Sequence, residues 1–200
     1  MATQISVIIP THNRRENVIK TLQCLWAQEL QPQHNMEILI VDHASTDGTI
    51  EALSELSNPS RFMTRILRME KRPVWGPSIP KNYGAKQSTV ASEALLFVDS
   101  DVMLPPYVVQ RYIDIYLRGN MDENRAIIGP YHMMRHPIEL VPRWWKDKNI
   151  IKDYAEDVRW KMMAEEFPDF NQKMQGLRFS LACYGGNIFI PRKLFFKAGG

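Results

Sequence analysis

The sequence predicts an α/β fold in which a mostly parallel central sheet lies between layers of helices, giving a three-layer sandwich. Short runs rich in Val, Ile and Leu are typical of strands covered on both faces, and they alternate with stretches whose apolar residues recur at helical spacing. Strands and helices that alternate in this way favour parallel strands joined by helical connections. At 200 residues, the chain suits a single domain with a sizeable core.

The first third of the chain contains three expected strands, at 5–9, 37–41 and 62–67. Pro10 closes the first of them, and after a polar turn the apolar residues from Glu16 onward follow a helical stripe. A second polar turn, at 42–48, leads into a short helix. We expect Asp47 to cap the N-terminus of that helix, because an Asp side chain accepts hydrogen bonds from the first free amides.

The middle of the chain repeats this order of elements. A loop through Pro80 precedes a helix at about 83–91, and a buried strand follows at 95–98. Pro105-Pro106 marks the start of the next helix, and Gly119 marks its end, since Pro fits a first helical turn and Gly fits a helix end.

The last third is less regular. Periodicity weakens over 131–175, and we expect this stretch to be a flexible excursion of loops and helix within the same domain. A final strand at 187–190 and a helix from Arg192 complete the predicted fold.

Composition excludes several classes of protein. The 25 basic and 22 acidic residues give a net charge of only +3, which does not favour nucleic acid as a partner. Cys24 and Cys183 are the only cysteines, so we expect neither a disulfide framework nor a zinc site, and a reducing, cytoplasmic compartment. The start of the sequence lacks a signal-peptide pattern, and no apolar run reaches bilayer-spanning length. We therefore expect at most peripheral contact with a membrane, at its inner face.

Polar residues follow three of the expected strands. In an open parallel sheet, ligands bind beyond the carboxyl ends of the strands, so these turns are expected to share one site. The residues are Thr11, His12, Asn13 and Arg14 after the first strand, Asp42, Ser45 and Asp47 after the second, and Asp99 and Asp101 after the fourth.

The pair Asp99 and Asp101 indicates a cation. Two carboxylates one residue apart repel each other, and a divalent metal or strong hydrogen-bond donors would stabilise them. Mn²⁺ or Mg²⁺ prefers such oxygen ligands, and a diphosphate would complete its shell. The alternative is that both residues only cap the turn before Pro105, because the Asp-Xaa-Asp tripeptide is common.

Three motifs in order resemble those of family 2 glycosyltransferases of the GT-A fold. They are Ser6 to Arg14, Ile40 to Thr49 and Phe97 to Asp101. The resemblance implies a Rossmann-like, nucleotide-sugar-dependent enzyme that uses Mn²⁺ or Mg²⁺, takes a nucleotide-diphosphate sugar with UDP favoured, and builds a glycan or polysaccharide. It also implies that the family's usual Arg-Asn pair corresponds to Lys81 and Asn82. Lys81 thus stands where the family usually has Arg. Its ammonium can meet a phosphate as a point charge, but it cannot form the bidentate hydrogen bonds of an Arg guanidinium.

The resemblance assigns roles to individual residues. Thr11 and Asp42 would hold the base and ribose, Asp99 the ribose or metal, and Asp101 would be the principal metal ligand. The full expected donor set is Pro10, Thr11, Asn13, Arg14, Asp42, Lys81, Asn82, Asp99 and Ser100, with Asp99 and Asp101 as metal ligands. Ser45 and Asp47 are interpreted as turn-forming residues. His12 is interpreted as a local hydrogen-bonding residue, and the role of His43, which departs from the family pattern, stays open.

The resemblance divides the domain into a donor-binding part, 1–130, and a partial acceptor side, 131–200. Gly185, Gly186 and Asn187 would lie on the acceptor side, where glycines allow close approach to a sugar. An inverting transfer needs a carboxylate base, and the resemblance places that base beyond Gly200. Glu156-Asp157 is interpreted as a solvated face instead.

Two alternatives remain at this point. Leu96 to Val102 locally resembles the first motif of a haloacid-dehalogenase-type phosphatase, although that reading leaves the turns at Thr11 and Asp42 unexplained. The second alternative is a truncated domain that binds nucleotide sugar without transferring it. A Rossmann dehydrogenase is disfavoured, because no Gly-Xaa-Gly-Xaa-Xaa-Gly follows the first strand.

Overall fold

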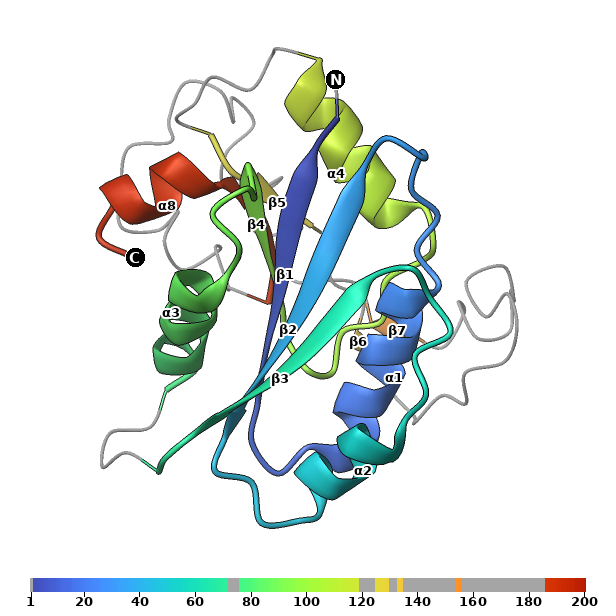
Figure 1. Cartoon of the computed structure of the whole chain (residues 1–200), viewed down its shortest axis with the longest axis vertical. Helices are drawn as coiled ribbons and strands as arrows, with labels where there is room; N and C mark the ends of the chain where they lie inside the picture. Colours follow the sequence, from blue (N-terminus) through green and yellow to red (C-terminus); the bar gives the residue numbers. More distant parts are fainter. Residues whose placement is uncertain (1, 72–75, 119–124, 130–132, 135–153, 156–185) are drawn as a thin grey trace.

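The computed structural model describes residues 2–71, 76–118, 125–129, 133–134, 154–155 and 186–200. Within them, six strands form one sheet in the order β3-β2-β1-β4-β8-β5 (Figure 1). The strands are β1 (Gln4–Thr11), β2 (Asn35–His43), β3 (Met63–Met69), β4 (Ala94–Val98), β5 (Ile127–Ile128) and β8 (Asn187–Pro191). The helices are α1 (Arg15–Trp26), α2 (Thr49–Glu55), α3 (Ser78–Gln87), α4 (Val108–Leu117) and α8 (Arg192–Lys197).

The sheet is mostly parallel, as predicted. β1 pairs in parallel with β2 and β4, and β2 pairs in parallel with β3. β8 runs antiparallel to β4, and β5 antiparallel to β8. Because β1 lies between β2 and β4, the carboxyl ends of these three strands are neighbours, and Thr11 is paired with Asp42.

Helices cover both faces of the sheet. Figure 1 shows α1, α2 and α4 on one side and α3 and α8 on the other. Alternate residues of β1 enter the two cores: Val7 and Ile9 pack with α1, α2 and α4, whereas Ile8 packs with α3. The continuous apolar runs in the sequence therefore reflect a sheet buried on both faces, which confirms the predicted three-layer sandwich.

A buried carboxylate joins the strands at the opposite, amino-terminal edge of the sheet. Glu37 of β2 accepts hydrogen bonds at Oε1 from the Ser6 hydroxyl and the Thr89 amide, both at 2.6 Å. Arg65 of β3 lies 3.5 Å from Glu37 Oε2. These contacts connect β1, β2, β3 and the segment before β4, away from the carboxyl ends.

All five predicted strands are present, with ends extended by a few residues or shifted by one, but two helix starts were predicted wrongly. α3 begins at Ser78 and ends at Gln87, so Pro80 lies in its first turn and not in a loop. Pro is tolerated there because the first amides of a helix have no partner within the helix. α4 begins at Val108, two residues after Pro106, and the Val109 amide donates to Gln28 Oε1 at 3.1 Å.

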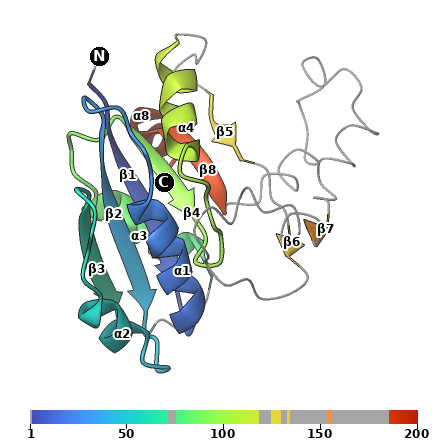
Figure 2. The ribbon, with the colours of Figure 1, turned by 90° about the vertical axis from the view of Figure 1, so that its right-hand side faces the viewer.

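The predicted excursion at 131–175 lies outside the described residues except for four of them. Met133–Met134 (β6) and Tyr154–Ala155 (β7) form a separate antiparallel pair, which Figure 2 shows apart from the main sheet. None of the helices in the described ranges is long and apolar enough to cross a membrane.

Candidate functional site

The turns after β1 and β2 are locked together by hydrogen bonds. His12 Nδ1 lies 2.7 Å from the His43 carbonyl oxygen, and the Asn13 amide donates to Ser45 Oγ at 2.9 Å. In return, the Thr46 amide donates to Asn13 Oδ1 at 2.7 Å. Asn13 has a φ of 51°, a left-handed conformation that Asn tolerates better than most residues. Within this geometry, His12, Asn13 and Ser45 all make hydrogen bonds that shape the turns.

Asp47 connects the same turns to two helices. Its Oδ1 accepts hydrogen bonds from the amide and hydroxyl of Thr49, and its Oδ2 accepts one from the Arg15 amide at 3.2 Å. The hydroxyl bond from Thr49, together with the amide bonds, lowers the pKa of Asp47. The N-cap of α2 is Gly48, in a left-handed conformation, and not Asp47 as predicted. Asp47 lies one residue before the N-cap, but it still accepts a hydrogen bond from the first helical amide, that of Thr49.

Thr11 and Asp42 lie side by side and face the α1 side of the sheet. Their side chains follow Ile9 and Ile40, which belong to the core beneath α1, α2 and α4. Thr11 is 4% exposed and Asp42 is 0% exposed. Asp42 Oδ2 accepts the Ser45 amide at 3.1 Å, whereas Asp42 Oδ1 and Thr11 Oγ1 have no hydrogen-bond partner among the described residues.

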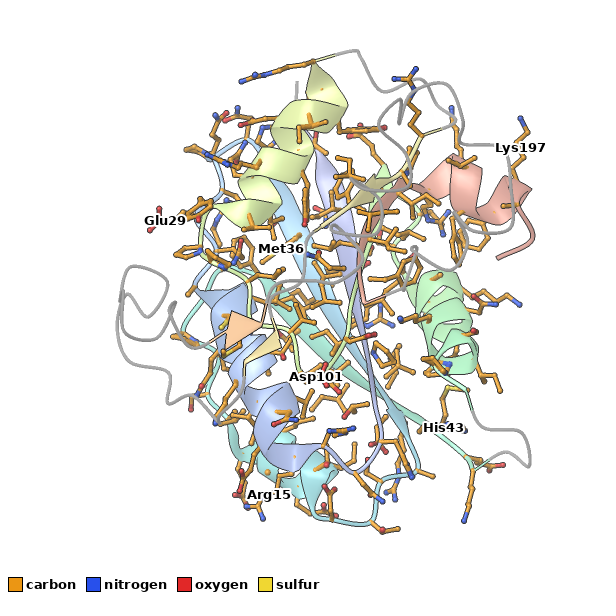
Figure 3. The ribbon with its side chains drawn as sticks, turned by 180° about the vertical axis from the view of Figure 1, so that it is seen from behind. Arg15, Glu29, Met36, His43, Asp101 and Lys197 are labelled. Atoms are coloured by element: carbon orange, nitrogen blue, oxygen red, sulfur yellow. The ribbon has the colours of Figure 1, made fainter. Side chains whose placement is uncertain are left out.

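His43 faces the opposite side of the sheet, beneath α3. It follows Val41, which packs in the core of that face. The His43 side chain is buried, its Nε2 has no hydrogen-bond partner in the described part of the chain, and its ring lies 6.3 Å from that of His12. Figure 3 shows His43 below α3, Asp101 between α1 and α3 in this view, and Arg15 on the α1 side.

Lys81 and Asp99 form an ion pair on the α3 face. Lys81 Nζ lies 2.8 Å from Asp99 Oδ1, and the two side chains are 12% and 41% exposed. Lys81 belongs to the first half of α3, and Asp99 directly follows β4. The exposed Asp101 lies two residues further along, and Ser100 between them is buried. An ion pair and, two residues further on, an exposed carboxylate therefore lie at the carboxyl edge of the sheet.

Asp99 and Asp101 fit a divalent metal by their chemistry. Both supply hard oxygen ligands of the kind that Mn²⁺ and Mg²⁺ prefer. The described residues contain no cluster of three or more potential metal-ligating side chains. A metal held here would therefore take its remaining ligands from water or from a bound phosphate group.

The predicted acceptor residues have a different environment. Gly185 lies outside the described residues, and the Gly186 carbonyl accepts the Asp99 amide at 2.9 Å. Asn187 is 2% exposed, and its Oδ1 accepts a hydrogen bond from Tyr112 Oη at 3.0 Å. Burial raises the pKa of Tyr112 to about 12, although the bond to Asn187 acts in the opposite direction. The Asn187 side chain thus anchors β8 to α4, whereas the backbone of the preceding Gly186 binds the Asp99 amide.

The remaining predicted residues lie around this edge. Arg14 is exposed at the N-cap of α1, and Pro10 is buried next to the end of β1. The Asn82 amide nitrogen donates to the Gly200 carbonyl at 3.1 Å.

His43 is a residue of this edge whose role stayed open in the sequence. Strand alternation contains the missing signal, because side chains two apart in a strand share a face. Counting from Leu39 and Val41 would have placed His43, and not Asp42, on the face of Lys81 and Asp99.

Comparison with known families gives a match over most of the chain. The model of the family described as Glycosyl transferase family 2 matches residues 6–185. The chain is 33% identical over 98 residues to the poly(ribitol-phosphate) beta-N-acetylglucosaminyltransferase TarS of Staphylococcus aureus (strain MW2), covering 49% of this chain and 16% of that protein. It is 29% identical over 117 residues to the dolichol-phosphate mannosyltransferase of Pyrococcus furiosus, covering 58% and 31%. The chain thus spans well under two thirds of these relatives.

Solved structures are similar over nearly the whole chain. TarS 1–349 of S. aureus in complex with UDP has a TM-score of 0.61 and 18% identity, covering 98% of this chain and 49% of that one. The mannosyltransferase PcManGT from Pyrobaculum calidifontis, in complex with GDP-Man and Mn²⁺, has a TM-score of 0.57 and 16% identity, covering 100% and 48%. These likenesses confirm the predicted GT-A fold, and none of the comparisons supports the phosphatase alternative.

Proposed function

We propose that this chain, which belongs to glycosyl transferase family 2, transfers a sugar from a nucleotide-diphosphate donor to a hydroxyl group of a glycan or another acceptor. The observation that carries the proposal is the ion pair of Lys81 with Asp99 at the carboxyl edge of the sheet, with the exposed Asp101 two residues further along the chain. This edge is where open α/β sheets bind their ligands. The ammonium of Lys81 suits a diphosphate, and the two carboxylates suit a divalent cation.

The metal is part of the proposal. Mn²⁺ or Mg²⁺ bound by Asp99 and Asp101 would stabilise the negative charge that develops on the departing diphosphate. Asp101 is exposed and suits the main ligand role, whereas Asp99 is shared with Lys81. The Mn²⁺ complex of PcManGT supports a divalent metal.

The nucleoside is proposed to lie on the α3 face, next to His12 and His43. The buried Nε2 of His43, which has no hydrogen-bond partner among the described residues, lies on the face of Lys81 and supports this position. Thr11 and Asp42 point to the other side of the sheet, so we now assign them to the support of the turns and not to direct contact with base and ribose. The UDP complex of TarS supports a UDP-sugar as donor, and the GDP-Man complex of PcManGT names the main alternative.

Inversion at the anomeric carbon is proposed by analogy with the family, and it requires a carboxylate that removes the proton of the acceptor hydroxyl. We assign no such base within the described residues, and its position after Gly200 stays a prediction. The second candidate function is the alternative named from the sequence, binding of a nucleotide sugar without transfer.

Calorimetric titration tests the donor site. The purified protein would be titrated with UDP-GlcNAc, GDP-mannose, UDP and GDP, with and without Mn²⁺. We expect one nucleotide class to bind, more tightly with the metal, and Asp101→Asn to remove the effect of Mn²⁺. Asp114→Asn, the same change on α4, should not alter binding. Absence of nucleotide binding under all conditions would contradict the proposal.

Transfer is then tested separately. Release of free UDP or GDP from the bound donor, measured with and without hydroxyl acceptors such as short glycans, distinguishes the two candidate functions. Acceptor-dependent release supports transfer. Tight donor binding without release supports the binding function instead.

A further inference from the structure

A positive charge already lies against the proposed metal ligands. Lys81 Nζ contacts Asp99 Oδ1 at 2.8 Å, so one carboxylate of the pair is neutralised by the chain itself. The Lys81 side chain is mostly buried, which strengthens the attraction relative to a fully exposed pair. A divalent cation that binds to Asp99 would be repelled by this ammonium and would have to share the carboxylate with it.

We propose that Lys81 competes with the metal for Asp99 and is drawn away by the diphosphate of the donor, so that donor and metal bind cooperatively. The proposal rests on the proposed function, because it requires a diphosphate at this edge. In the absence of nucleotide, Lys81 holds Asp99 and keeps the affinity for metal low. When the diphosphate takes up the ammonium, Asp99 becomes available as a ligand.

The backbones on both sides of the ion pair are held in place. The Asp99 amide is bound to the Gly186 carbonyl, and the Asp99 carbonyl accepts the Val102 amide at 3.1 Å. On the other side, Gly84 brings α3 so close to the sheet that a Cβ there would lie 2.6 Å from a side-chain carbon of Ile8. Release of the Asp99 carboxylate is therefore expected to involve movement of side chains and not a shift of either backbone. Lysine suits this exchange, because its ammonium is a point charge on a flexible stem, whereas arginine binds carboxylates with a rigid fork.

The mechanism predicts opposite effects of one substitution on the two ligands. Removing the ammonium should strengthen metal binding without nucleotide, since Asp99 loses its competitor. It should weaken nucleotide binding, since the diphosphate loses a partner. Because coupling between two ligands is reciprocal, the gain in metal affinity caused by nucleotide should also shrink. A residue that only supports the fold would not produce a gain in metal affinity.

Electron paramagnetic resonance of Mn²⁺ provides the test, because the six-line signal of the free ion reports the bound fraction directly. Mn²⁺ titrations would be run on the purified protein, Lys81→Met, Lys81→Arg and Lys86→Met, each alone and with UDP or GDP. Lys86 lies on the exposed side of the same helix, so Lys86→Met makes the same change of charge away from Asp99. Circular dichroism and thermal unfolding would show that each variant is folded. Lys81→Gln replaces Lys81→Met if the latter does not fold.

We expect Lys81→Met to bind Mn²⁺ about fivefold more tightly without nucleotide. UDP or GDP binding in the presence of Mn²⁺ should weaken about tenfold. Lys86→Met should keep the Mn²⁺ affinity of the parent protein, whereas Lys81→Arg, which retains a positive charge against Asp99 and binds it with a fork, should bind Mn²⁺ no more tightly than the parent. Unchanged or weaker Mn²⁺ binding by Lys81→Met, including no detectable binding by either protein, would overturn the proposal. If the parent protein binds neither UDP nor GDP, the proposed function fails, and so does the proposed displacement of Lys81 by a diphosphate. The comparison of Mn²⁺ binding by the parent protein and by Lys81→Met without nucleotide still tests separately whether Lys81 competes with the metal.

Discussion

Gly84 of α3 lies where the helix touches the sheet, and replacing it with alanine should destabilise the protein. A Cβ at this position would lie 2.6 Å from Cγ2 of Ile8 and 2.9 Å from Cγ2 of Val41. Both distances are shorter than contacts between real carbon atoms allow, and both partners are fully buried. Neither side chain can move away without disturbing the core of this face.

Two effects of opposite sign decide the outcome. Alanine in the middle of a helix is favoured over glycine by about 1 kcal/mol. Forcing an extra carbon into a packed core costs about 1–3 kcal/mol. Because the short distances involve two side chains on two strands, we expect a steric cost in the upper part of this range, about 2–3 kcal/mol, which exceeds the gain in helix propensity. The net loss in the free energy of unfolding should be about 1–2 kcal/mol.

Urea unfolding followed by far-UV circular dichroism measures this loss. Gly76→Ala is the matched control, because a Cβ at Gly76 would meet nothing within 4 Å. Its stability should stay within about 0.5 kcal/mol of the parent protein. In a double-mutant cycle, Ile8→Ala should recover about 1 kcal/mol of the loss caused by Gly84→Ala, because it removes the nearest methyl group. A Gly84→Ala protein that equals or exceeds the parent in stability would refute the packing argument.

Three further predictions concern buried polar groups. Glu37→Met should lower the free energy of unfolding by about 2–4 kcal/mol, and more than Glu37→Gln, because only the amide oxygen of Gln can still accept the two buried donors. Thermal and urea unfolding would give this order, and equal losses would contradict it. Gln28→Met should cost about 1–3 kcal/mol in the same assay, since Gln28 caps α4 at the Val109 amide. Tyr112 has a pKa raised from 10.0 to about 12, so stability should fall by about 2–3 kcal/mol as pH rises between these values. The free energy of unfolding of Tyr112→Phe should not fall in this way between these pH values. If it falls equally in both proteins, Tyr112 is not the cause.

Most of the sheet could be predicted from the sequence, because buried strands have a local signature. The runs at 5–9 and 37–41 are apolar throughout, and each became the centre of a strand covered on both faces. The start of α3 could not be predicted in the same way. Pro80 is a general signal of a helix boundary, and the three preceding residues lack an apolar stripe, so local pattern favoured a loop there.

The sequence predicted that the site lies at the carboxyl edge of the sheet, but not which residues lie on which face of the sheet. Alternation of strands and helices placed Asp42 and Asp99 at the same end of the sheet, and the pairing of the strands confirms it. Bonds between turns distant in sequence, such as that of Asn13 with Ser45, have no local signal. The ion pair of Lys81 with Asp99 forms because Lys81 lies in α3. The predicted helix began at about residue 83, so Lys81 was assigned to a loop and the ion pair was not predicted.

The two positions at which this chain departs from the pattern it resembles lie on one face of the sheet. Lys81 stands for the usual Arg, and His43 stands for the usual acidic or Asn residue. Both lie on the α3 side, where we place the donor, whereas Asp42, which keeps the pattern, is buried on the other side. The residue type at a buried position that holds a turn is restricted by packing, whereas the residue type at a position that faces a ligand is restricted by the chemistry of that ligand. Donor preference in this chain is therefore expected to depend on His43 and Lys81 more than on the residues that keep the turns in place.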